Sequence, residues 1–268
     1  MSLQLALNLS TVFTELPLLE RFQCAADAGF RGVEIQFPYD IGPEAIATAA
    51  ARAGVDIVLI NAPAGDLMTG GPGLAGVPAK VDEFEQALTL CESYIEHLNP
   101  ECINILAGRA DDSHSPRECL DTFAQNLRRA AQRFRARGVT TVFEAINRKD
   151  MPGFLIASSD EQLALLRQLR DAGVRLQVDV YHLATAGEIV ADSLARTLPH
   201  AAHIQFADVP GRGEPGSGEI DFCAIVDEIK RSDYQGWLSA EYRPTGPSAD
   251  SFGWLESAPF SGLLAAAD

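Results

Sequence analysis

Short apolar runs alternate with segments of helical spacing along the whole chain, and this alternation constrains the fold more than any other feature. The runs span residues 3–9, 32–37, 56–61, 102–106, 140–144, 176–179, 203–206 and 237–241. Between them, apolar residues recur at helical spacing in segments such as 16–28, 80–98, 116–137, 159–170 and 221–230. Helical crossovers make consecutive strands parallel, and eight strand and helix repeats fit a closed barrel better than an open sheet. The sequence therefore predicts an α/β protein with the (β/α)8 TIM barrel fold.

Glycines punctuate this pattern. A glycine precedes several of the strands, where a left-handed residue typically ends a helix; these are Gly29, Gly54, Gly138, Gly173 and Gly236. We expect all five to mark turns from helix to strand. The eighth helix is only weakly indicated, because residues 248–267 contain a proline and two glycines.

The chain length favours one domain. An α/β barrel commonly uses about 200 to 250 residues as a single unit, and the 268 residues here contain no linker between compositionally different halves. We therefore expect one domain over residues 1–268. The five cysteines form no Cys-x-x-Cys pair, and the N-terminus lacks the basic start and apolar run of a signal peptide. These features predict reduced thiols and a cytoplasmic protein.

The net charge limits the partners. The chain carries 21 Lys and Arg against 37 Asp and Glu, a formal charge of -16. A field of this sign repels nucleic-acid phosphates and anionic lipid heads, and no run reaches the roughly 18 apolar residues that span a bilayer. We expect neither a nucleic acid nor a membrane as partner, and the sequence leaves open whether the chain forms a homo-oligomer.

Polar side chains end four consecutive predicted strands, where barrels place their chemistry. They are Glu144, Asp179, Gln205 and Glu241. A single acid at a barrel mouth often pairs with Arg or Lys in a structural salt bridge. Structural salt bridges explain less well why four successive strands all end in a polar side chain. Three converging carboxylates need a positive charge, and an all-oxygen donor set selects a hard divalent cation, Mg²⁺ or Mn²⁺.

Three further residues are candidates for binding a ligand at this rim. His182 lies where the chain leaves the barrel, in a place that suits either a substrate contact or a helix cap. Arg212 offers a planar cation that can hold a carboxylate in bidentate fashion, and Lys149 is a second choice. His203 points to the same side as Gln205 but is better explained as a hydrogen-bonded core histidine.

Two long glycine-rich loops, 62–79 and 208–220, follow strands and so belong to the active face of a barrel. The first is equally well explained as ordinary surface, whereas the second is favoured as functional. Residues 211–216 match G-x-G-x-x-G, but no helix begins there to receive a pyrophosphate. The sequence thus gives no sign of an organic cofactor.

Long motifs in the chain resemble the hydroxypyruvate isomerase-like members of the xylose isomerase-like barrels. They include Asn-Ala-Pro-Ala-Gly-Asp at 61–66, Glu-Ala-Ile-Asn at 144–147, Gln-Val-Asp-Val-Tyr-His at 177–182 and the run from residue 203 to residue 220. The resemblance implies a metal held by Glu144, Asp179, Gln205 and Glu241, with the two glutamates also moving protons. Sugar epimerases with the same barrel usually carry histidine where Gln205 stands.

The resemblance implies an isomerase that acts on a small anionic sugar acid. Hydroxypyruvate would become tartronate semialdehyde through an enediolate, and a sister group that isomerises 2-oxo-tetronates has nearly the same motifs. A sugar epimerase is a weaker alternative. A phosphodiesterase of the same superfamily would need a histidine-rich zinc cluster and a basic face, and a noncatalytic binding protein would not need both Glu144 and Glu241.

Overall fold

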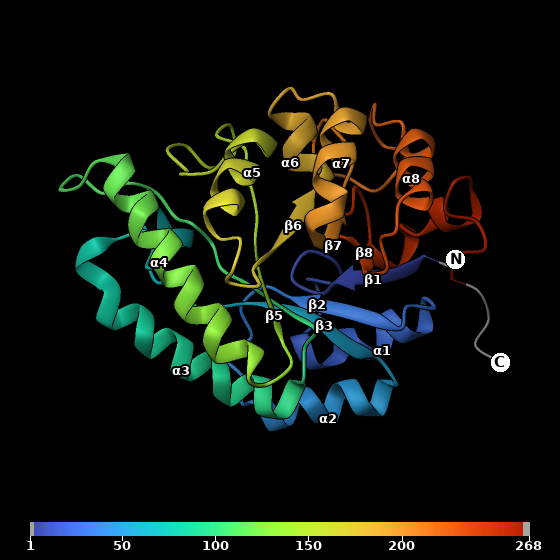
Figure 1. The fold of residues 1–268 in the computed structure, drawn as a ribbon. Helices are drawn as coiled ribbons and strands as arrows, with labels where there is room; N and C mark the ends of the chain where they lie inside the picture. The colour runs from blue at the N-terminus through green and yellow to red at the C-terminus, as the bar shows by residue number, and fades with distance from the viewer. Residues whose placement is uncertain (1–2, 265–268) are drawn as a thin grey trace.

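The strands close into a barrel. The computed structural model describes residues 3–264, and its strands follow one another around the barrel in chain order, with every pair parallel (Figure 1). Their bounds are β1 (Gln4–Asn8), β2 (Gly32–Ile35), β3 (Asp56–Asn61), β4 (Cys102–Asn104), β5 (Thr140–Phe143), β6 (Arg175–Asp179), β7 (Ala201–Phe206) and β8 (Trp237–Ala240). The predicted TIM barrel is confirmed. The carboxyl end of each strand lies within two residues of the end of a predicted apolar run.

Helices cover the outside of the barrel. They are α1 (Leu18–Asp27), α2 (Pro43–Ala53), α3 (Val81–Leu98), α4 (Pro116–Arg135), α5 (Ser159–Gln168), α6 (Val180–Thr185), α7 (Val190–Thr197) and α8 (Phe222–Arg231). Side-chain caps begin several of them: Ser115 and Glu118 form a capping box at α4, and Asp221 accepts from the Ala224 backbone N–H at α8. Apolar faces of the helices pack on the strands to form one main core.

Two expectations about chain ends and turns are wrong. Both α6 and α7 follow β6, so α8 comes before β8. Within the described residues, the segment after β8 forms two short 3₁₀ turns, Ser248–Asp250 and Gly253–Glu256, where the pattern predicted an α-helix. Gly236 is not a left-handed cap, unlike the other four glycines, which all have positive φ. A Cβ at Gly236 would lie 2.4 Å from the Ala202 carbonyl oxygen, so glycine is required there by close approach of two strands.

The strand register brings polar residues together at the carboxyl ends of the strands. Asp179 of β6 lies opposite Gln205 of β7, and Asn8 of β1 lies opposite Glu34 of β2. Because Phe206 pairs with Ala240, Glu241 follows directly after the last paired residue of β8. The barrel thus presents a ring of polar side chains at one rim.

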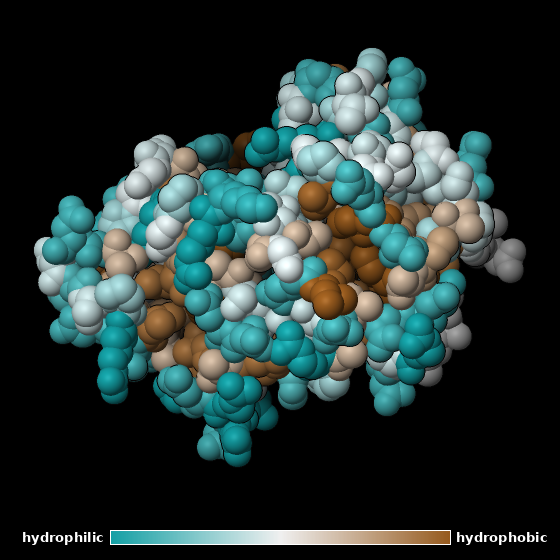
Figure 2. Space-filling view, turned by 90° about the horizontal axis from the view of Figure 1, so that it is seen from above, coloured by the Kyte–Doolittle hydropathy of each residue, from teal (hydrophilic) through white to brown (hydrophobic). Residues whose placement is uncertain are grey.

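The molecular surface is mainly hydrophilic in the view of Figure 2, with hydrophobic residues in patches between hydrophilic ones. No helix in residues 3–264 has both the length and the apolar character to cross a bilayer. The five cysteines are unpaired, and three of them, Cys91, Cys102 and Cys119, are buried.

Candidate active site

A cavity of about 450 Å³ opens at the carboxyl ends of the strands. Glu144, His182 and Glu241 line its floor, together with Arg212. The wall includes Leu67 and Met68 from the long loop after β3, and Gly211 from the long loop after β7. Both loops predicted on the active face therefore border the cavity.

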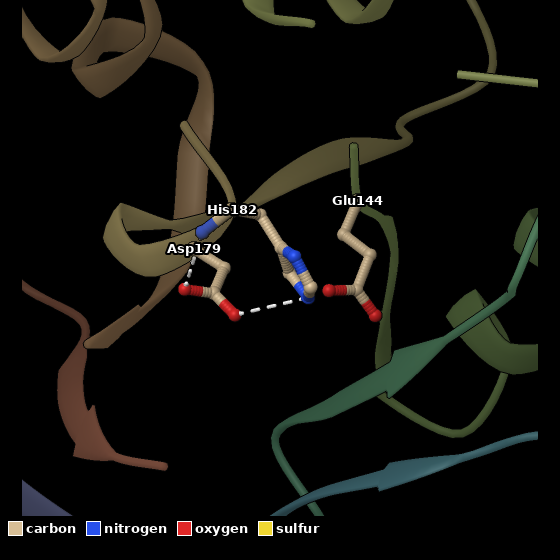
Figure 3. A group of neighbouring side chains, drawn as sticks. All are labelled: Glu144, Asp179 and His182. Carbon is tan, nitrogen blue, oxygen red and sulfur yellow. Dashed lines mark hydrogen bonds and ion pairs between the residues drawn. The ribbon is translucent and has the colours of Figure 1, made fainter. Parts of the chain in front are cut away.

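Glu144 and Asp179 face a common space (Figure 3). One donor atom from each, together with one from His182, lie within 4.8 Å of one another. Glu144 follows β5 and accepts a hydrogen bond of 2.7 Å from the Asn104 amide. Burial raises the pKa of the Glu144 carboxyl to about 8, and the Asp179 carboxylate acts in the same direction. This carboxyl group is therefore suited to holding a proton near neutral pH.

Asp179 is oriented by the helix that follows it. Its Oδ1 accepts from the backbone N–H of Tyr181 at 2.8 Å and of His182 at 3.4 Å, so the residue caps the N-terminus of α6. These bonds hold one carboxylate oxygen and leave Oδ2 directed into the site, 3.5 Å from His182 Nε2 and 3.3 Å from the Arg212 guanidinium.

His182 is held in one tautomer by Asn147. The Asn147 Oδ1 accepts from two backbone N–H groups, of Lys149 and Asp150, so its Nδ2 must be the group 2.7 Å from His182 Nδ1. His182 Nδ1 is then an acceptor, and the ring proton lies on Nε2. Burial lowers the pKa of His182 to about 4, which keeps the ring neutral. His182 therefore presents an N–H donor, and not a lone pair, to the cavity.

Arg212 lies between the acids. Its Nη2 contacts Glu241 and Asp179, and its guanidinium carbon lies 4.9 Å from the centre of the Tyr181 ring. Burial alone would lower the pKa of Arg212, but the carboxylates of Glu241 and Asp179 raise it. Its backbone has a φ of 59°, which is unusual for a residue other than glycine. The loop after β7 thus folds so that Arg212 returns to the strand ends.

Glu241 is enclosed by donors. Besides Arg212, the Gln205 amide and the Asn8 amide donate to it, and Gln36 donates at 3.1 Å. Burial raises the pKa of the Glu241 carboxyl well above its usual range, although Arg212 acts in the opposite direction. Glu241 and Glu144 thus share the property of a raised pKa and face the same cavity.

Gln205 directs its nitrogen, and not its oxygen, toward Glu241. The Nε2 donates to Glu34 and Glu241, and the Oε1 accepts from Gln177 at 2.5 Å. The Gln177 Oε1 is buried without a hydrogen bond. If the side-chain amides of Gln177 and Gln205 both flipped, Gln205 Nε2 would donate to the Gln177 Oε1, and Gln205 Oε1 would face the site.

Glu34, which no sequence pattern singled out, lies under the site. It is fully buried, accepts from Asn8 at 2.7 Å, and lies 2.6 Å from His203 Nε2. Burial opposes its ionisation, but His203, Gln205 and Asn8 together lower its pKa. His203 is thus the hydrogen-bonded core histidine that was expected. The available signal was a lone acid inside the four-residue apolar strand Gly-Val-Glu-Ile.

Lys149 is exposed and does not line the cavity, so the structure does not bring this candidate to the site. Two arginines that the sequence analysis did not single out, Arg109 and Arg243, line it instead. Asp208 has a structural role, because its carboxylate accepts from the backbone N–H groups of Gly216, Gly218 and Ile220 and shapes the loop after β7.

Comparison with known proteins identifies the family. Residues 22–258 match the family model of the xylose isomerase-like TIM barrel. The chain belongs to this family. The hydroxypyruvate isomerase of Escherichia coli is 33% identical over 95% of this chain and 98% of its own length. The 2-oxo-tetronate isomerase of Pectobacterium atrosepticum is also 33% identical, over 94% of this chain and 96% of its own.

Solved structures of similar proteins agree with the family. A protein from Brucella melitensis, described as an AP endonuclease of family 2, is 32% identical, with a TM-score of 0.90 over 94% of this chain and 97% of its own. A 3-keto-D-glucoside 4-epimerase of E. coli has a TM-score of 0.77 at 19% identity, which shows the shared fold alone. The resemblance inferred from the motifs is confirmed, and so is the prediction of an enzyme, since the curated relatives are named as isomerases.

The donor set of the site fits a divalent cation of the kind that the resemblance implies. The acids Glu144, Asp179 and Glu241 are all buried. Within the described chain Arg212 is the one cation that contacts any of them, and it contacts Asp179 and Glu241. Burial raises the pKa of Glu144 and of Glu241, and the neighbouring carboxylates act in the same direction, so a cation among these groups would stabilise their ionised forms. Carboxylate and amide oxygens are hard donors, and His182 cannot add its Nε2 while Asn147 holds the proton there.

Proposed function

We propose that the protein is a metal-dependent isomerase of a small 2-oxo-3-hydroxy acid, converting hydroxypyruvate to tartronate semialdehyde. One observation carries the proposal: two buried glutamates with raised pKa values, Glu144 and Glu241, face one cavity from different strands. A 1,2-proton shift needs groups that both take and return a proton near neutral pH. The E. coli and P. atrosepticum relatives carry the names of isomerases of this kind.

The proposed cation is Mg²⁺ or Mn²⁺, held by Glu144, Asp179, Glu241 and the oxygen of a rotated Gln205. When bound, it supplies Lewis-acid stabilisation for the negative charge that develops on the two neighbouring substrate oxygens. The unpartnered oxygen of Gln177 supports this role for Gln205, because it provides an acceptor for the amide nitrogen after rotation.

The reaction balances with these residues alone as proton carriers. One glutamate carboxylate removes a proton from C3 of hydroxypyruvate, and the electron pair forms the C2–C3 double bond of an enediolate. The protonated glutamate, whose acid proton can exchange with solvent, delivers a proton to C2, while a second proton passes from the C3 oxygen to the C2 oxygen with the help of the other glutamate. His182, as a neutral N–H donor, is placed to hydrogen-bond a substrate oxygen. No organic cofactor is required by this scheme.

A 2-oxo-tetronate, with one more carbon, undergoes the same chemistry and is the alternative substrate. The named relatives include both activities at equal identity, so sequence similarity does not separate them. The Brucella protein, described as an endonuclease, raises a third activity, the cleavage of nucleic acid. The site argues against it, since three carboxylates and a net charge of -16 repel a phosphate backbone.

The test is a comparison of rates. Purified protein, freed of metal with EDTA, is supplied with Mg²⁺ or Mn²⁺ and assayed on hydroxypyruvate and on both 2-oxo-tetronate enantiomers. We expect turnover of at least one acid that depends on the added ion. Absence of turnover on all of them, or turnover unaffected by removal of the metal, contradicts the proposal. Cytoplasmic location stays a prediction, and the oligomeric state stays open.

A further inference from the structure

The cavity needs a cation that is free to hold the anionic end of a substrate. Glu144, Asp150 and Glu241 all line it, and each of them opposes the entry of an anion when it is ionised. Three arginines, Arg109, Arg212 and Arg243, also line it. Their hydrogen bonds decide which of them is available.

Arg109 is already committed to the protein backbone. Its guanidinium donates to the carbonyl oxygens of Pro152, Leu67 and Gly71 at 2.9, 3.0 and 2.7 Å. These bonds tie the loop after β3 to the loop after β5. Moving Arg109 onto a ligand would leave three carbonyl groups without this donor, so we assign it to the support of the cavity wall.

Arg212 is committed to the acids. Its Nη2 contacts Glu241 and Asp179, and its Nε donates toward the Glu241 carbonyl oxygen at 3.4 Å. A substrate carboxylate on Arg212 would compete with two buried carboxylates for the same guanidinium. The expectation that Arg212 anchors the carboxylate stays a prediction, and a guanidinium with no partner would bind the substrate without this competition.

Arg243 is the lining arginine whose guanidinium makes no hydrogen bond or ion pair with any residue between 3 and 264. It lies two residues past Glu241, and its backbone N–H donates to the Arg212 carbonyl oxygen at 2.7 Å. The backbone is thus tied to the catalytic face while the side chain is exposed at the cavity. A guanidinium in this setting matches a carboxylate with two parallel hydrogen bonds.

We propose that Arg243 binds the carboxylate of the substrate and so selects 2-oxo acids over neutral ketoses. The inference rests on the proposed function for the identity of the substrate. It differs from the sequence-based expectation, in which Arg212 or Lys149 would hold this group.

The test separates charge recognition from catalysis. Arg243→Gln should raise the KM for hydroxypyruvate about 10- to 100-fold, the loss expected for one charged hydrogen-bonding partner, with a kcat within about threefold of wild type. Arg243→Lys should recover part of that loss. Inhibition by dihydroxyacetone, in which a neutral CH₂OH replaces the carboxylate, should be unchanged in both variants.

Arg167→Gln is the matched control. Arg167 is exposed in the last turn of α5, at the opposite end of the barrel, and its replacement removes the same charge from the whole molecule. An equal rise in KM in this variant would show a general charge effect and overturn the inference. An unchanged KM in Arg243→Gln would also overturn it, and so would an equal weakening of the inhibition by dihydroxyacetone in that variant.

Calorimetric titration with hydroxypyruvate keeps this inference distinct from the proposed function. If the wild-type protein binds the acid and does not turn it over, the isomerase proposal fails, and the affinity of Arg243→Gln still decides the role of Arg243. A dissociation constant that stays at the wild-type value in that variant refutes the anchor, whatever the activity.

Discussion

Replacing Glu144 by glutamine should stabilise the metal-free protein against unfolding, and the gain should increase with pH. The folded protein holds this carboxyl with a pKa of about 8, against an ordinary value of 4.5, because burial and Asp179 disfavour its charge. Between these two values the unfolded chain releases the proton while the folded chain keeps it. The stability of the wild type should therefore fall as pH rises through this window.

The size of the effect follows from the pKa difference. Each pH unit between 4.5 and 8 costs the wild type about 1.4 kcal/mol, so the contribution of Glu144 changes by on the order of 4 to 5 kcal/mol across the window. Below pH 4.5 the group is protonated in both states and contributes no slope. Glutamine keeps the shape of the side chain and does not titrate. The difference in the free energy of unfolding between Glu144→Gln and wild type therefore isolates the contribution of the Glu144 charge.

Urea unfolding at pH 5, 6, 7 and 8, with EDTA present, measures the free energy of unfolding of both proteins. The difference between Glu144→Gln and wild type should rise steadily over this range. Glu83→Gln, on the exposed side of α3, is the control and should show no comparable slope. A difference between Glu144→Gln and wild type that stays flat from pH 5 to 8 would refute the electrostatic reasoning about this site.

Three other substitutions probe the site and the barrel. Glu241→Gln should lower kcat about 10²- to 10⁴-fold through loss of a general base; a near-native rate in a variant with an unchanged circular dichroism spectrum would contradict its role. Asp179→Asn should weaken the binding of Mn²⁺, which calorimetry measures independently of activity. An unchanged affinity would remove Asp179 from the proposed ligands. Gly32→Ala should cost about 1 to 3 kcal/mol in urea unfolding, because its Cβ would lie 2.5 Å from the buried Trp237 ring; unaltered stability would show that the ring moves freely.

The barrel was predictable because its signal is local and repeated. Each strand is a short apolar run, and a polar residue or a glycine marks several of the strand ends, so the order of strands required no knowledge of tertiary contacts. The C-terminal segment after β8 was harder to predict, because the proline and glycines there break helical spacing without indicating the 3₁₀ turns that replace it. Gly236 was misassigned for a related reason, since spacing does not distinguish a left-handed turn from a close approach of backbone.

The candidate acids were also predictable, because strand ends converge in any closed barrel. The pairing of Arg212 with Asp179 and Glu241 was not, since it depends on how the loop after β7 folds back across the rim. The orientation of the Gln205 amide depends on Gln177 and Glu34, which come from other strands. The spacing of residues in the sequence thus does not predict contacts between segments that lie far apart in the chain.

Hydrogen transfer in D₂O distinguishes a glutamate proton relay from a direct hydride shift. In the proposed mechanism a glutamate carries the proton between C3 and C2, and a carboxylic acid proton exchanges with solvent when the cavity is open to water. Hydroxypyruvate is incubated with the metal-supplied protein in D₂O and the product is examined by NMR at early times, before uncatalysed enolisation adds label. We predict deuterium at C2 of tartronate semialdehyde. Complete retention of the substrate hydrogen at C2 would contradict the glutamate relay and indicate direct hydride transfer between the two carbons.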